Sequence, residues 1–262
     1  MDLHYKIHYS CLSHIGNVRP INQDNFICDG RYIENNDETI IKFPISGTKI
    51  SKVPLVFGIF DGLGGEECGE IASYIVSKAA SNIEIGKDVI ADLHQFCHKA
   101  NEDICDYAAT HGISAMGTTA AMLVFTAREV SLCNIGDSKI FRLCNGTLEQ
   151  ISMDHITIAA YGRKPSLYQN LGIPTNELEI DPYFAKGRYN DGDVYLICSD
   201  GLTDMVSADE ITEVLVSQSI EKAILRLLDK ALTNGGKDNI TIILCKIESR
   251  FGWKFNWKRH IN

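Results

Sequence analysis

The order of short apolar segments and amphipathic helices is the feature that most constrains how this chain can fold. Eight runs rich in β-branched and aromatic residues, each bounded by turn residues, predict β-strands. These runs are residues 5–11, 25–28, 54–60, 118–126, 130–134, 139–143, 194–198 and 240–247. The segments with helical periodicity form two pairs, and they do not alternate one by one with the strands. We therefore expect mostly antiparallel sheets, because a parallel sheet needs a crossover between successive strands.

The first predicted helix pair has apolar residues four apart from Ile71 to Ile83, and then at helical spacing from Val89 until Gly112. The second pair begins at the capping box Ser207–Glu210 and runs to Asn234-Gly235.

The dipeptide Asn145-Gly146 separates two predicted strands, 139–143 and 147–151, and favours a type I′ hairpin. Together with the helix pairs, these strands predict an α+β fold. We expect a four-layer αββα sandwich of two mostly antiparallel β-sheets, flanked by helix pairs.

The chain has 262 residues, is 45% apolar, and shows neither an internal repeat nor a low-complexity linker. We expect a single domain over residues 1–248, followed by a basic, aromatic tail over residues 249–262. Two segments carry no clear pattern. Residues 30–52 form a polar excursion between strands that could be a hairpin, and residues 152–192 are rich in turn residues.

Charge and hydropathy narrow the possible partners and location. The excess of 34 acidic over 25 basic residues gives a net charge of −9, which disfavours binding to nucleic acid. The apolar runs are shorter than the roughly 18 residues of a transmembrane helix, and the N-terminus lacks the core of a signal peptide. We expect a monomeric, cytoplasmic protein without a transmembrane segment.

Aspartates occur at the ends of the predicted strands. They are Asp24, Asp61, Asp137, Asp200 and Asp238. If these ends meet, the carboxylates cannot all stay ionised without a counter-charge, and divalent cations would supply it. Oxygen ligands without neighbouring Cys or His favour Mg²⁺ or Mn²⁺ over zinc. For any single position, an ordinary role in a turn remains open.

The segment Asp61-Gly62-Leu63-Gly64-Gly65 could also be a nucleotide-binding loop. However, Glu67 stands where the third glycine of such a loop belongs, and no phosphate-binding lysine follows. The glycines are better explained by a close approach of backbone carbonyls to a cation.

Several short motifs resemble, in order, those of the metal-dependent serine/threonine protein phosphatases of type 2C (the PPM family), and of its compact bacterial branch in particular. The motifs are GNVRPINQD (16–24), DGLGG (61–65), MGTT (116–119), NIGDS (134–138), DH (154–155), SDGLTD (199–204) and DNIT (238–241). Each motif is weak alone, but their common order covers nearly the whole chain.

The resemblance implies a centre of two Mn²⁺ or Mg²⁺ ions bridged by Asp61. The further implied ligands are the Gly62 carbonyl, Asp200, Asp238 and, through a water molecule, Asp24. Asp137 and Asp204 match the ligands of a weaker third ion in bacterial relatives.

The implied reaction is hydrolysis of phosphoserine and phosphothreonine in proteins, by in-line attack of a hydroxide that bridges the two ions. Arg19 matches the phosphate-binding arginine of the family and can bind two phosphate oxygens; an ordinary surface arginine is the alternative. The segment from Asp154 to about Pro182 corresponds to the flap beside the active site. His155 within it is expected to be a turn residue.

Two positions depart from the family pattern. Gln23 stands where many relatives have Glu, which removes one negative charge. Leu63 stands where some eukaryotic relatives have a histidine that acts as general acid, so a metal-bound water would have to protonate the leaving group.

Two other functions remain open from the sequence. One is a pseudophosphatase that binds phosphorylated partners without turnover, and the other is a hydrolase of small phosphomonoesters. The retained Asp24, Asp61, Asp200 and Asp238 argue against the first.

Overall fold

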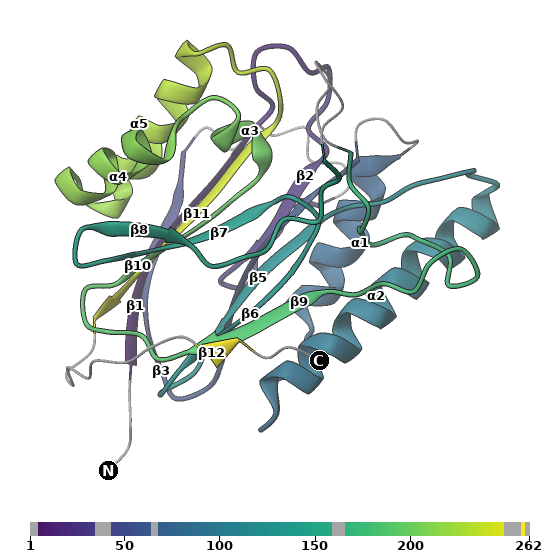
Figure 1. Cartoon of the computed structure of the whole chain (residues 1–262), viewed down its shortest axis with the longest axis horizontal. Helices are drawn as coiled ribbons and strands as arrows, with labels where there is room; N and C mark the ends of the chain where they lie inside the picture. The colour runs from purple at the N-terminus through teal and green to yellow at the C-terminus, as the bar shows by residue number, and fades with distance from the viewer. Residues whose placement is uncertain (1–4, 35–42, 64–67, 159–165, 249–257, 260–262) are drawn as a thin grey trace.

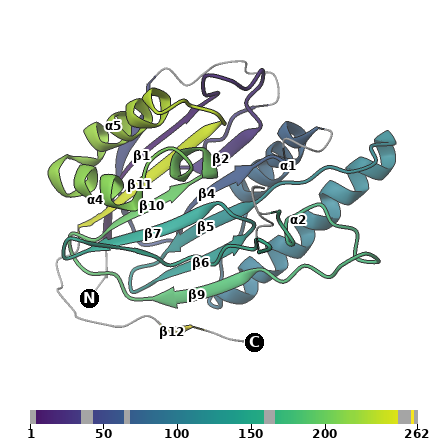
Figure 2. The same ribbon diagram turned by 45° about the horizontal axis from the view of Figure 1, so that its top comes forward.

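The computed structural model describes residues 5–34, 43–63, 68–158, 166–248 and 258–259. In these residues the chain forms the predicted αββα sandwich, with two β-sheets packed face to face and helices on the outer face of each (Figure 1, Figure 2). Every strand pairing within the sheets is antiparallel.

The first sheet, called sheet A here, brings together strands from both ends of the chain. Its order is β3 (Ile45–Ser51), β1 (Tyr5–His14), β11 (Ile240–Glu248), β10 (Val194–Cys198), β7 (Lys139–Cys144) and β8 (Thr147–Gln150). The second, sheet B, has the order β12 (Lys258–Arg259), β9 (Tyr183–Gly187), β6 (Val130–Ile135), β5 (Ala120–Phe125), β4 (Leu55–Asp61) and β2 (Asp24–Cys28).

The helices form the two outer layers. Helices α1 (Gly69–Ser81) and α2 (Val89–His111) cover sheet B, and α4 (Ala208–Ser217) and α5 (Ile220–Thr233) cover sheet A. The short helix α3 (Asp200–Thr203) follows β10 directly.

Alternation along the strands distributes the apolar side chains among three cores. On β11, Ile243 and Cys245 face the core between the sheets, whereas Ile242 and Leu244 face the core under α4 and α5. Because both faces of the central strands are covered, their side chains are apolar on both sides, and this explains the continuous apolar runs in the sequence.

The predicted local signals are confirmed. Ser207 and Glu210 form the capping box of α4, and α2 ends at Gly112 with a φ of 68°. Asn145 and Gly146 both have positive φ, 51° and 80°, as a type I′ turn between β7 and β8 requires.

Four elements escaped prediction, and the three strands among them depend on pairing with remote segments and not on local sequence. Strand β3 lies within the polar segment 30–52 and pairs with β1 at the edge of sheet A, where its side chains are mostly exposed. The described part of this segment contributes that one strand, and residues 35–42 lie outside the described residues. Strands β9 and β12 and the short helix α3 were also not predicted.

The predicted tail is described only at residues 258–259, which form β12 and pair with β9. Its other residues lie outside the described part of the chain. Among the described residues, we find no helix with the length and apolar character that crossing a membrane requires.

Candidate functional site

Strand register brings Asp24 and Asp61 together. β2 and β4 are antiparallel neighbours in which Asp24 lies opposite Asp61. Phe57 and Ile59 of β4 face the core between the sheets, so Asp61, two residues further, points to the same face. Because directly opposite residues share a face, both carboxylates lie at one end of the space between the two sheets.

Asp24 is buried and held by sheet A. Its Oδ2 accepts hydrogen bonds from Ser199 Oγ at 2.8 Å and from Thr241 Oγ1 at 2.6 Å. Its Oδ1 is buried and has no hydrogen-bond partner among the described residues. Burial, reinforced by the charges of Asp200 and Asp238, raises the pKa of Asp24 to about 7. One carboxylate oxygen is therefore left to bind a water molecule or a cation.

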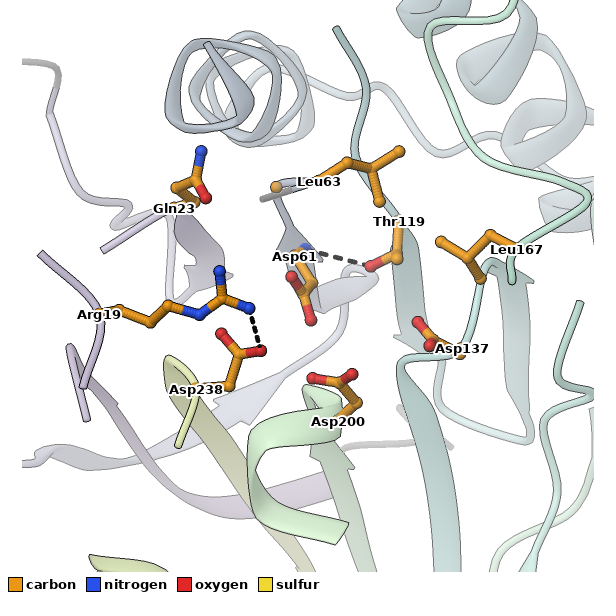
Figure 3. A pocket seen from close by; sticks show the side chains of 10 residues that line it. Arg19, Gln23, Asp61, Leu63, Thr119, Asp137, Leu167, Asp200 and Asp238 are labelled. Atoms are coloured by element: carbon orange, nitrogen blue, oxygen red, sulfur yellow. Dashed lines mark hydrogen bonds and ion pairs between the residues drawn. The ribbon is translucent and has the colours of Figure 1, made fainter. Parts of the chain in front are cut away.

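Beside these residues lies a cavity of about 170 Å³ at the strand ends (Figure 3). Its described lining residues are Arg19, Gln23, Asp61, Gly62, Leu63, Thr119, Asp137, Leu167, Asp200 and Asp238. Figure 3 shows the carboxylates of Asp61, Asp200 and Asp238 around a common space, with Asp137 to one side. Asp200 follows β10 and Asp238 precedes β11, both in sheet A, whereas Asp61 ends β4 and Asp137 follows β6, both in sheet B. The cavity therefore spans both sheets.

Negative charge predominates in the cavity, where four aspartates face one arginine. Burial, together with the charges of Asp24, Asp200, Asp137 and Asp238, raises the pKa of Asp61 well above its ordinary value. The atoms here that could bind a cation are carboxylate and carbonyl oxygens, which suit a hard divalent cation. In the described part of the chain, no three acidic, histidine or cysteine side chains already stand close enough together to enclose an ion. The residues thus fit a cation in chemistry, but they must approach one another to surround it.

Arg19 supplies positive charge at the rim of the cavity. Its Nη2 donates to Asp238 Oδ2 at 2.7 Å, and this bond raises the pKa of Arg19. The sequence-derived roles, phosphate binding for Arg19 and metal binding for Asp238, therefore meet in one ion pair.

Asn239 holds the loop that carries Arg19. Its side-chain oxygen accepts from the Gln23 amide at 2.9 Å, and its Nδ2 donates to the carbonyls of Ile15 and Ile21 at 2.9 and 3.0 Å. Gly16 in this loop has a φ of 82°, and a Cβ there would overlap the Asp238 carbonyl oxygen. The loop is therefore packed tightly against the start of β11.

The opposite wall is fixed by the residues around Thr118. The Asp61 carbonyl accepts from the Thr119 amide and from Thr118 Oγ1, both at 2.9 Å. The Gly62 amide donates to the Gln23 carbonyl at 3.1 Å, and the Leu63 amide to the Gly117 carbonyl at 3.0 Å. Two successive residues of the glycine loop are thereby tied to neighbouring segments.

Residues 171–173, called the flap end here, are attached to the same network. Thr118 and Leu171 exchange backbone hydrogen bonds of 3.0 and 2.9 Å. The buried side chain of Asn101 on α2 accepts from the amides of Gly172 and Ile173 at 2.7 and 3.0 Å, and donates to the Ile173 carbonyl at 2.9 Å. Asn101 therefore connects α2, through the flap end, to the loop that carries Asp61.

Among the predicted ligands, Asp24 lies behind the described lining of the cavity and Asp204 does not line it; His155, expected to be a turn residue, does not line it either. Asp204, implied as a third-ion ligand with Asp137, is exposed at the C-terminus of α3, one helical turn beyond Asp200. His155 is buried, accepts from the Gly136 amide through Nδ1 at 3.2 Å, and donates its own amide to the Gly136 carbonyl at 2.9 Å. It thus supports the turn that carries Asp137, and burial lowers its pKa.

Gln23 lines the cavity and donates from Nε2 to Glu70 Oε2 on α1 at 3.3 Å. A glutamate at this position would place a second negative charge next to Glu70, whereas the amide of Gln23 makes a favourable contact.

Sequence reasoning missed four residues that organise the site: Asn101, Ser199, Asn239 and Thr241. The last three lie in motifs next to the predicted aspartates, so their polar side chains at strand ends were a usable signal. Asn101 gave a weaker signal, as a polar residue on the apolar face of a helix.

Comparison with known proteins identifies the family of this chain. The sequence profile of the family described as Protein phosphatase 2C matches residues 48–233. This chain belongs to the protein phosphatase 2C family. The profile match includes Asp61, Gly62, Asp137, Asp200 and Asp204, whereas Arg19, Gln23, Asp24 and Asp238 lie outside it.

Bacterial members of the phosphatase 2C family are similar over most of the chain. The serine/threonine protein phosphatase PstP of Mycobacterium tuberculosis is 29% identical over 231 residues, which cover 83% of this chain and 45% of PstP. The chain thus corresponds to less than half the length of that relative. The serine/threonine phosphatase stp of Listeria innocua is 28% identical over 253 residues, covering 87% of this chain and 91% of stp.

Solved structures of the phosphatase 2C fold superpose closely. The catalytic domain of PstP, in complex with two manganese ions, gives a TM-score of 0.75 at 27% identity and covers 94% of this chain and 100% of that one. PppA of Pseudomonas aeruginosa gives a TM-score of 0.76 at 24% identity over 93% of this chain and 99% of its own, which shows the shared fold.

Proposed function

We propose that this protein is a metal-dependent phosphatase that removes phosphate from phosphoserine and phosphothreonine in proteins. The observation that carries the proposal is the meeting of Asp61, Asp200 and Asp238 with Arg19 around one cavity. Membership in the phosphatase 2C family and the names of its relatives PstP and stp support the same reaction.

The proposed ligands of two Mn²⁺ or Mg²⁺ ions are Asp61, the Gly62 carbonyl, Asp200 and Asp238, with Asp24 acting through a water molecule. Oδ1 of Asp24, which has no hydrogen-bond partner among the described residues, and the carboxylates gathered around the buried Asp61 support this assignment, since a cation would bind the first and offset the repulsion of the others. When bound, such ions would lower the pKa of water and so supply the nucleophile for in-line attack on phosphorus. The two manganese ions in the solved PstP domain are consistent with this number.

Arg19 is proposed to bind the phosphate of the substrate. Its guanidinium can donate to two phosphate oxygens at once and balance the charge that develops on them. A cation bound at Asp238 would compete with Arg19 for that carboxylate and leave the guanidinium available to phosphate. Arg19 and Asp238 would then act in sequence, not as a permanent pair.

Water is proposed to protonate the leaving serine or threonine oxygen. Leu63 has no ionisable group, and the other described lining residues offer only carboxylates, amides, a hydroxyl, an aliphatic chain and Arg19. His155, the histidine of the flap motif, is engaged with Gly136 instead.

Asp137 and Asp204 remain the proposed ligands of a weaker third ion. The negative charge of Asp137 contributes to the raised pKa of Asp61, which supports a position of Asp137 close to the proposed metal centre. We further propose that residues 1–248 form a single phosphatase domain and that residues 249–262 form a separate tail. The protein is proposed to be monomeric and cytoplasmic. Its proposed partners are phosphoproteins and not nucleic acid. The net charge of −9 supports the last of these.

The test is turnover of a phosphothreonine peptide by the full chain and by Asp61→Asn and Asp200→Asn. Each variant should lose at least about two orders of magnitude in kcat, because each removes a charge proposed to hold a catalytic ion. Asp229→Asn is the matched control, since Asp229 pairs with Arg226 on the exposed face of α5. It should keep the activity of the unaltered protein.

Removal of divalent ions by EDTA should abolish activity, and Mn²⁺ should restore it. Full activity in EDTA would refute the proposal. Tight peptide binding without turnover, even with Mn²⁺, would indicate a pseudophosphatase, and preferential hydrolysis of a sugar phosphate would indicate a small-molecule phosphomonoesterase.

A further inference from the structure

Helix α2 carries a pair of histidines on its surface, outside the acidic cavity. His94 and His98 are one helical turn apart, and their side chains lie next to each other because residues four apart share a helix face. His94 is exposed and His98 is half-buried. The ring of His94 also contacts Phe184 on β9, with 5.9 Å between ring centroids, and this contact limits the positions that the ring can take.

The two rings are oriented with their outer nitrogens toward each other. The Nε2 atoms are 3.2 Å apart, and the ring centroids are 4.4 Å apart. Two imidazole nitrogens bound tetrahedrally to one ion, at metal–nitrogen distances of about 2.0–2.1 Å, are separated by about 3.3 Å. The observed separation therefore matches that of two nitrogens that share a metal ion.

We propose that His94 and His98 form a second metal site, which binds a borderline divalent ion such as Zn²⁺ or Ni²⁺ through two imidazole nitrogens. Imidazole favours these ions, whereas Mg²⁺ and Mn²⁺ favour carboxylate and carbonyl oxygens. The α2 site and the acidic cavity would thus select different ions. Water completes the coordination of the ion at the α2 site.

A bound ion would link two consecutive turns of α2. Asn101, which holds the flap end, follows His98 by three residues on the same helix. The ion would therefore stabilise the helix segment from which the flap is held. This proposal is independent of the phosphatase reaction.

The test is a titration of the full chain with Zn²⁺ or Ni²⁺ in the presence of saturating Mg²⁺, which occupies oxygen sites and leaves imidazole free. Calorimetry should show one more Zn²⁺ site in the unaltered protein than in His94→Gln or His98→Gln. At ten times the dissociation constant, Zn²⁺ should raise the melting temperature by about 3–5 °C in the unaltered protein, with a smaller rise in both variants.

His111→Gln is the matched control. His111 is on the same helix and is exposed, but its Nδ1 contacts the Tyr107 carbonyl and its ring stacks on Tyr107, with 3.9 Å between centroids. This variant should bind as much Zn²⁺ as the unaltered protein.

Paramagnetic Ni²⁺ gives a second measurement that does not depend on stability. It should broaden the imidazole proton resonances of His94 and His98 at lower concentration than those of His111. Equal Zn²⁺ stoichiometry in the unaltered protein and both variants, or equal broadening of all three histidines, would show that the short Nε2–Nε2 distance is a hydrogen bond only and would overturn the proposal.

Discussion

Hydrogen bonds to backbone groups fix the wall of the acidic cavity that sheet B contributes, whereas the wall next to sheet A also contains an ion pair between two side chains. On the first wall, the Asp61 carbonyl accepts from Thr119 and Thr118. On the second, Asp238 is paired with Arg19, and the side chain of Asn239 holds the loop before β2. The comparison teaches that folding itself sets the position of Asp61 on the sheet B wall. On the sheet A wall, the charge of Asp238 is balanced by Arg19, which can exchange this carboxylate for another partner.

Substitution of Arg19 should separate activity from stability on the sheet A wall. Arg19→Ala should reduce kcat/KM for a phosphopeptide by about two to three orders of magnitude, because a charged donor to the phosphate is lost. Its free energy of unfolding should change by less than about 1 kcal/mol, since the side chain is 38% exposed and its ion pair is close to solvent. Steady-state kinetics and urea denaturation measure the two effects.

Arg226→Ala, which removes a surface ion pair on α5, is the control for loss of an arginine. It should leave kinetics unchanged. If Arg19→Ala were as active as the control, Arg19 would not be the phosphate-binding residue.

On the sheet B wall, in contrast, substitution of Asn101 should mainly lower the stability of the protein. Asn101→Ala leaves three backbone groups of the flap end without their partner, at Gly172 and Ile173. The loss of stability should be about 3 kcal/mol, because an unsatisfied buried group costs about 1–3 kcal/mol. Urea denaturation measures it, with Asn82→Ala at the exposed end of α1 as control. Unchanged stability would mean that the flap end is held by other contacts.

The free energy of unfolding of the metal-free protein should depend on pH, because carboxylates lie on both walls of the cavity. The pKa of Asp24 in the folded protein, about 7, lies above its ordinary value of 3.8. Between these values the folded state retains a proton that the unfolded state has released. The free energy of unfolding should therefore fall as the pH rises from about 4 to 7.

Denaturation in EDTA across this pH range measures the slope. Asp24→Asn should flatten it, because the neutral amide does not titrate, and Mn²⁺ should stabilise the unaltered protein more at the upper end of the range. The same slope in the unaltered protein and Asp24→Asn would show that Asp24 does not carry the effect.

The smallest expected effect is far from both walls. Ser207→Ala removes the capping box of α4 and should cost about 1 kcal/mol. Activity should not change, because α4 packs on the outer face of sheet A. A large loss of activity would show that the sheet A wall depends on its helix layer, and would weaken the contrast between the walls. Ser81→Ala, at a half-buried serine at the end of α1, is the control.

Much of the fold could be predicted because it depends on local chemistry. The capping box at Ser207, the turn at Asn145-Gly146 and the helix end at Gly112 each specify a backbone conformation within a few residues. In contrast, β3 and β9 are short strands whose hydrogen-bond partners are remote in sequence, so local propensity did not identify them.

For the site, the sequence by itself determined the candidate residues: aspartates at strand ends, Arg19 and the glycine loop. Only the tertiary structure decided which of them meet. The register that sets Asp24 opposite Asp61, the pairing of Arg19 with Asp238, and the bond from Asn101 to the flap end join residues 37, 219 and 71 or 72 positions apart. The physical reason is that such contacts depend on strand register and on packing between layers, which no local stretch of sequence specifies.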